Sequence, residues 1–62
     1  MSTILYNKKN DDGRRVAVVV GSGRYKVFVK WHTHSKWQRY YNLPFKDSAL
    51  LAANLLFNLE YH

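Results

Sequence analysis

The chain is short and basic: its 62 residues include ten Lys and Arg but only four Asp and Glu, which gives a net charge of +6. This length excludes more than one domain, the absence of cysteine excludes a disulfide framework, and an apolar fraction of 47% excludes a disordered tail. No apolar run reaches the ~18 residues that span a bilayer and the N-terminus lacks a signal-peptide pattern, so we expect one cytoplasmic domain over residues 1–62 without a membrane partner.

The first half of the chain predicts an antiparallel hairpin. Residues 2–6 favour a short strand, and residues 7–13 favour a polar connection. Residues 15–20 and 25–31 are rich in β-branched side chains, and Ser22-Gly23 fits the tip of a tight turn between them. This register places an apolar set on one face: Val16, Val18, Val20, Tyr25, Val27 and Val29. It places a set rich in bases on the other face: Arg15, Ala17, Val19, Lys26, Phe28 and Lys30.

Residues 37–43 predict a third strand, joined to the hairpin by a connection of about three residues. In this register Trp31 lies opposite Arg39, and Val29 lies opposite Tyr41. Pro44 ends the strand, because proline cannot donate a hydrogen bond to the ladder. Arg39 then falls on the apolar face, which conflicts with the pattern of the hairpin.

The C-terminal residues predict one helix from residue 49 to about residue 61, capped by Asp47 or Ser48. One apolar stripe is expected to face the sheet: Leu51, Ala52, Leu55, Leu56 and Leu59. A second stripe is expected either to form a partner or dimer interface or to lie beneath the N-terminal segment: Leu50, Ala53 and Phe57.

Together these elements predict an α+β fold, a three- or four-stranded antiparallel sheet with one C-terminal helix packed on one face. The expected core contains Val16, Val18, Val20, Tyr25, Val27, Val29, Trp31, Tyr41, Leu43, Leu51, Leu55 and Leu59.

The chain lacks the residue patterns of a catalytic or metal centre. Asp11 and Asp12 are neighbours in an expected loop, so they form no carboxylate pair for acid–base chemistry. Ser22 lies in a hairpin turn, which is neither a nucleophile elbow nor a phosphate loop. His32 and His34 share a strand face but have no further metal ligands nearby. We therefore expect no enzymatic activity, no metal and no cofactor.

The bases are concentrated in one segment. Residues 13–46 hold eight Lys and Arg and no Asp or Glu, which indicates a surface that binds polyanions. A solvated sheet face also needs polar side chains, but Glu or Thr would serve that purpose equally well. Cations hold phosphates, aromatic rings stack on bases and amides read base edges. The expected nucleic-acid-binding residues are Arg15, Arg24, Lys26, Phe28, Lys30, His32, Gln38 and Tyr40.

The order of elements resembles a known family. A hairpin over residues 16–31, a strand over residues 37–43 and a turn over residues 44–48 lead into an Ala-rich helix. This arrangement is similar to the arm-site DNA-binding domain of tyrosine recombinases and to the AP2 domain. The resemblance implies that the sheet enters the major groove of DNA and that the helix packs behind it. Ser48-Ala49 stands where those families usually have a glutamate-alanine pair.

The sequence thus favours a noncatalytic nucleic-acid-binding module, with DNA preferred to RNA as partner and with homodimerisation through the helix. The alternative is a small accessory protein of a phage or mobile element. Such a protein would bind an acidic protein surface and inhibit or modulate a larger complex, as anti-CRISPR inhibitors do. The two functions differ in whether the bases or a few aromatic anchors dominate binding.

Overall fold

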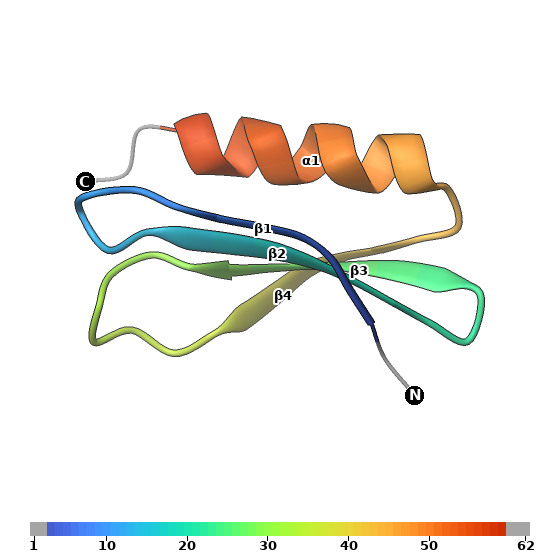
Figure 1. The fold of residues 1–62 in the computed structure, drawn as a ribbon, viewed down its shortest axis with the longest axis horizontal. Coiled ribbons are helices and arrows are strands. Elements are labelled where there is room, and N and C mark those ends of the chain that lie inside the picture. The colour runs from blue at the N-terminus through green and yellow to red at the C-terminus, as the bar shows by residue number, and fades with distance from the viewer. Residues whose placement is uncertain (1–2, 60–62) are drawn as a thin grey trace.

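The computed structural model describes residues 3–59, which form a four-stranded antiparallel sheet covered on one face by one helix (Figure 1). The strands β1 (Thr3–Lys9), β2 (Arg15–Gly21), β3 (Arg24–Lys30) and β4 (Gln38–Leu43) lie side by side in chain order, and α1 (Lys46–Asn58) follows them. The predicted α+β fold is confirmed. Among the described residues, no helix is long and apolar enough to cross a membrane.

The β2–β3 hairpin has the predicted register, because Val16, Val18 and Val20 pair with Val29, Val27 and Tyr25. Both residues at its tip, Ser22 and Gly23, have positive φ angles, 54° and 73°, as a tight hairpin turn of the primed type requires. The centre of this hairpin is the core of the domain. Four valines are fully buried there: Val16, Val18, Val27 and Val29.

β1 is longer than expected, because it continues to Lys9 through residues predicted to form a connection. Its expected first residue, Ser2, lies outside the described residues. The strand pairs with β2 along its whole length, with a register shift between Ile4 and Tyr6. This irregularity places Ile4 opposite Val19 and Asn7 opposite Ala17.

The predicted register of β4 is wrong. Tyr41 pairs with Val27, and Arg39 pairs with Phe28, whereas Arg39 was expected to face Trp31. The connection between β3 and β4 is longer than expected, and a bulge opposite Val27 and Phe28 adds Tyr40 as an extra residue. The bulge turns Arg39 away from the helix, so the conflict in the predicted pattern disappears.

The buried face of α1 differs in part from the prediction: Ala52 and Leu56 of the expected stripe pack on the core, but Leu51, Leu55 and Leu59 do not. Ala49 and Ala53 are fully buried against the sheet, and Leu56 is 8% exposed. Leu50, Ala53 and Phe57 pack against the core of their own domain, and Lys8 of β1 lies over the Phe57 ring, as expected if the N-terminal segment covers this stripe rather than a partner. The side chains expected to fill the core are exposed instead: Leu51 61%, Leu55 63%, Leu59 51% and Tyr41 44%. Small alanines at the centre of the contact let the helix approach the valine layer closely.

The start of α1 also differs from the prediction. Phe45 is the N-cap residue, and it makes no side-chain cap hydrogen bond. Asp47 and Ser48 lie inside the helix rather than at its cap. Asp47 is the acidic residue of the first turn, where a negative charge interacts favourably with the helix dipole.

The end of α1 is fastened to the sheet by Arg14. Its Nη1 donates hydrogen bonds to the carbonyl oxygens of Phe57, at 2.9 Å, and Leu59. The same guanidinium lies 4.9 Å from the centre of the Trp31 ring. The helix ends at Asn58, whereas its expected end, Tyr61, lies outside the described residues. Arg14 thus joins the helix terminus, the β1–β2 turn and the aromatic edge of the core.

Candidate functional site

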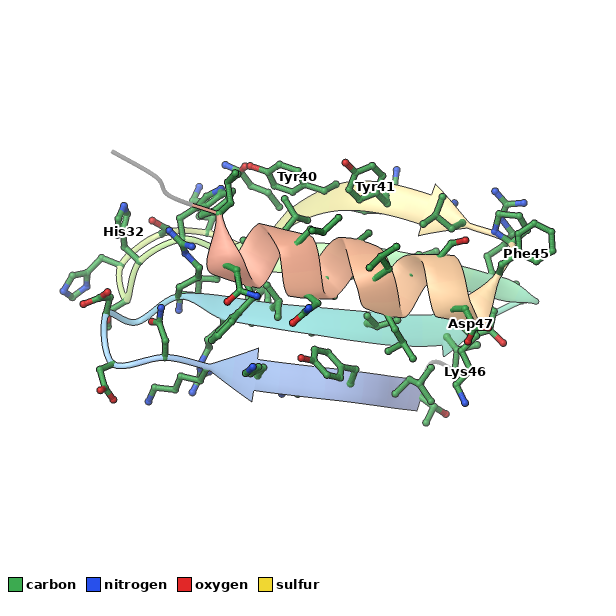
Figure 2. All side chains as sticks on the ribbon, turned by 90° about the horizontal axis from the view of Figure 1, so that it is seen from above. His32, Tyr40, Tyr41, Phe45, Lys46 and Asp47 are labelled. Atoms are coloured by element: carbon green, nitrogen blue, oxygen red, sulfur yellow. The ribbon has the colours of Figure 1, made fainter. Side chains whose placement is uncertain are left out.

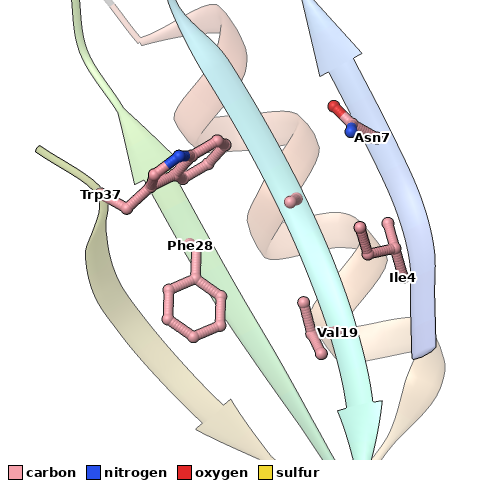
Figure 3. A pocket seen from close by; sticks show the side chains of 6 residues that line it. Ile4, Asn7, Val19, Phe28 and Trp37 are labelled. Atoms are coloured by element: carbon pink, nitrogen blue, oxygen red, sulfur yellow. The ribbon is translucent and has the colours of Figure 1, made fainter. Parts of the chain in front are cut away.

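One face of the sheet has no helix on it, and we call it the open face. Figure 3 views this face, with the helix behind the sheet. Cross-strand partners share a face, so the pairing assigns its side chains directly. From β1 to β4 they include Ile4, Asn7, Lys9, Arg15, Ala17, Val19, Lys26, Phe28, Lys30 and Arg39.

An apolar hollow of about 240 Å³ occupies the middle of the open face. It is lined by Ile4, Asn7, Ala17, Val19, Phe28 and Trp37. The Trp37 ring enters it from the connection before β4 and is 44% exposed (Figure 3). The hollow therefore presents two aromatic rings and only one polar side chain, that of Asn7. We call it the aromatic hollow.

A row of three cations crosses the open face next to the aromatic hollow. Lys9 pairs with Arg15, and Arg15 pairs with Lys30, so the three side chains lie on neighbouring strands. With a strand spacing of about 4.8 Å, their backbones span only about 10 Å. Gly13 and Thr33 complete a second hollow of about 180 Å³ around them, which we call the cation hollow.

The three cations of the cation hollow form no ion pair within residues 3–59. Asp11 and Asp12 are exposed on the β1–β2 turn. The side chains are thus available to an anion from outside.

The structure brings together half of the predicted site and separates the rest. Arg15, Lys26, Phe28 and Lys30 lie on the open face as expected. Arg24 belongs to the same side, but its guanidinium is bonded to Asn42, with Nε 3.0 Å from Oδ1 and Nη2 2.9 Å from the backbone oxygen.

Three other predicted residues lie elsewhere. His32 is exposed in the β3–β4 connection, at the end of the molecule where α1 ends (Figure 2). The Tyr40 hydroxyl accepts a hydrogen bond from Trp31 Nε1 at 2.7 Å and lies 3.3 Å from the Gln38 Oε1 that it donates to. Because Trp31 belongs to the core and Gln38 pairs with Val29, Tyr40 and Gln38 lie on the helix side and not on the sheet face that carries Lys30. The bulge explains this reversal.

Sequence reasoning missed the contributions of Ile4, Asn7, Lys9 and Trp37. The alternation of Asn7 and Lys9 with Tyr6 and Lys8 continues the strand pattern, and this signal could have extended β1. Trp37 lies in an irregular connection, where alternation cannot predict on which face of the sheet a side chain lies. The position of the Trp37 ring depends on the tertiary structure.

Residues 3–59 contain no group of three or more His, Asp or Glu side chains that could hold a metal ion. No protein-family model, curated protein or solved structure matches the chain. The resemblance to recombinase arm-site and AP2 domains consequently stays a prediction. The fold and the site define a small α+β domain with an open, basic and aromatic sheet face.

Proposed function

We propose that this protein is a noncatalytic nucleic-acid-binding module that uses the open face of its sheet. The observation that carries the proposal is the position of two aromatic rings, the half-buried Phe28 and the exposed Trp37, beside three cations that form no ion pair within residues 3–59. Cations neutralise phosphates and aromatic rings stack on bases, and proteins that bind nucleic acids combine both.

The composition of the open face argues against a merely solvated surface. An antiparallel sheet needs polar side chains on its outer face, and lysine on strands discourages aggregation. Neither requirement explains why Ile4, Phe28 and Trp37 line one hollow on that face. Grouped exposed apolar side chains with a charged margin are typical of a binding site.

The proposal predicts a strong dependence on salt. Lys9, Arg15, Lys26 and Lys30 offer up to four phosphate contacts on the open face. Each contact with a single strand contributes about −0.7 to the slope of log K against log salt. Binding should therefore weaken about 50-fold between ~50 and ~200 mM salt.

Titration of a labelled oligonucleotide tests the proposal. Lys30→Glu is expected to weaken binding at least about fivefold, because it removes a phosphate contact and adds a repulsive charge. Lys46→Glu is the matched control, since Lys46 lies exposed at the start of α1 (Figure 2). Equal effects of the two substitutions would refute a role for the open face. Absence of binding at ~50 mM salt would refute the proposal, and capture of an acidic protein partner would become the next experiment.

A second candidate function, binding to another protein, is favoured by the outer side of α1. Three leucines are exposed there, at helical spacing: Leu51, Leu55 and Leu59. We infer that this outer leucine surface, rather than the stripe predicted from the sequence, would form a homodimer if the protein dimerises. Sedimentation equilibrium of the wild type and of Leu55→Ser tests this, because a monomeric wild type would exclude the homodimer.

A further inference from the structure

The aromatic hollow and the cation hollow are neighbours on the same strands. Phe28 and Lys30 lie on one face of β3, two residues apart, which corresponds to about 7 Å along the strand. Ala17 and Arg15 lie beside them on β2 in the same relation. One ligand can therefore occupy both hollows, with its apolar part in the first and its anionic part in the second.

The aromatic hollow suits an unpaired base. A base within a duplex is already stacked on both sides, so its flat face is not accessible to a protein ring. Phe28 and Trp37 are reached only by a base that has left the stack or belongs to a single strand.

The middle of the open face, where the aromatic hollow lies, offers few groups that read the edges of paired bases, because the Lys and Arg side chains lie outside the lining of that hollow. Reading a groove requires side chains that donate to or accept from base edges. Gln38 lies on the helix side of the sheet, and the Asn42 amide oxygen accepts a hydrogen bond from Arg24. Asn7 is the single polar side chain that lines the aromatic hollow. The centre of the face is therefore apolar where a groove-reading sheet needs hydrogen-bonding groups.

The cation hollow is held in shape by a close contact between two loops. An added Cβ at Gly13 would lie 2.3 Å from Thr33 Oγ1, so only glycine permits this approach. The β1–β2 turn and the β3–β4 connection thus lie against each other at the strand ends that carry the three cations, and Gly13 and Thr33 line the hollow there. The hollow is thus formed before a ligand arrives.

From these observations we infer that the ligand is single-stranded nucleic acid, with a base in the aromatic hollow and a phosphate in the cation hollow. This inference rests on the proposed function and narrows the ligand from nucleic acid in general to single strands. It differs from the resemblance to groove-reading domains, which implies duplex DNA. Stacking is tolerant of sequence, so the module is expected to bind with little sequence preference.

Tryptophan fluorescence provides a direct test. Trp37 is 44% exposed in the aromatic hollow, whereas Trp31 is 6% exposed on the helix side. Titration with a thymidine oligomer of ~12 nucleotides at ~50 mM salt should quench the emission, and a duplex of equal length should bind at least tenfold more weakly. Trp31→Phe should keep both the quenching and the affinity, with its fold checked by circular dichroism.

A substitution pair tests the same point without relying on Trp31. Trp37→Ala should weaken binding of the labelled thymidine oligomer by about tenfold, the loss expected for one stacked base. Tyr41→Ala is the matched control, since Tyr41 is also 44% exposed but pairs with Val27 on the helix side. It should leave the affinity within about twofold.

The outcomes separate the two proposals. Equal or tighter binding of the duplex, saturation without quenching, or equal effects of Trp37→Ala and Tyr41→Ala would overturn the single-strand inference and leave nucleic-acid binding in place. Absence of binding to either oligonucleotide would overturn both proposals.

Discussion

Replacing Arg14 with alanine is expected to release the C-terminal end of α1 from the sheet. The substitution removes the hydrogen bonds to the Phe57 and Leu59 carbonyls and the contact with the Trp31 ring. A hydrogen bond from a charged group contributes about 1.5–3 kcal/mol and a cation–π contact about 0.5–2 kcal/mol.

Two features reduce this sum. The bond to Leu59 is exposed to solvent, and the buried Arg14 Nε has no hydrogen-bond partner within residues 3–59. We therefore expect a loss of about 2–3 kcal/mol in the free energy of unfolding, a large fraction of the ~3–9 kcal/mol typical of a domain of this size.

Urea unfolding followed by circular dichroism measures the effect. With a slope near ~1 kcal/mol per molar urea, the midpoint of Arg14→Ala should fall by about 2 M. Arg15→Ala is the control, because Arg15 is the next residue but lies on the open face and forms no ion pair with any residue that the structure describes. It should change stability by less than about 0.5 kcal/mol and weaken oligonucleotide binding instead. Similar midpoints for the two variants would refute the assignment of structural and binding roles to these neighbouring arginines.

Two further pairs of variants test the packing through the same unfolding measurement. Gly13→Ala should lose about 2–4 kcal/mol, because its φ is +88° and the new Cβ would lie 2.9 Å from the Thr33 backbone nitrogen. Gly23→Ala should lose only about 1 kcal/mol, since φ of Gly23 is +73° but no atom lies within 4 Å of an added Cβ. Comparable losses of stability for Gly13→Ala and Gly23→Ala would contradict the close contact at Gly13. Leu56→Ala should lose about 2–4 kcal/mol. Leu55→Ser should change stability by less than about 0.5 kcal/mol, because Leu55 is 63% exposed. A larger loss of stability for Leu55→Ser than for Leu56→Ala would support the helix orientation expected from the sequence.

The β2–β3 hairpin was predictable because two strands constrain each other. Its turn and the alternation in both strands agree on a single register, and a slip of one residue would move every valine to the wrong face. The placement of Arg15, Lys26, Phe28 and Lys30 on the open face followed from this register. In β4 the pattern came from a single strand: Arg39 on the apolar face marked a conflict, but nothing in the alternation placed the inserted residue at Tyr40.

The facing of α1 was not predictable from hydrophobicity. Both sides of the helix are apolar, so the pattern gives no preferred direction. The choice depends on packing: Ala49, Ala53 and Leu56 are buried against the sheet, whereas Leu51 and Leu55 are left exposed. Complementarity of this kind belongs to the assembled structure, as does the entry of Trp37 into the aromatic hollow.

The strict alternation of side chains between the two faces of β2 and β3 has a consequence for the evolution of this protein. Fully buried valines determine the fold, and the side chains between them lie on the open face, away from the helix. A substitution at Ala17, Val19 or Lys26 therefore alters the binding surface while the packing stays the same. The domain is consequently a scaffold on which new ligand preferences can arise by single steps, in nature or in the laboratory.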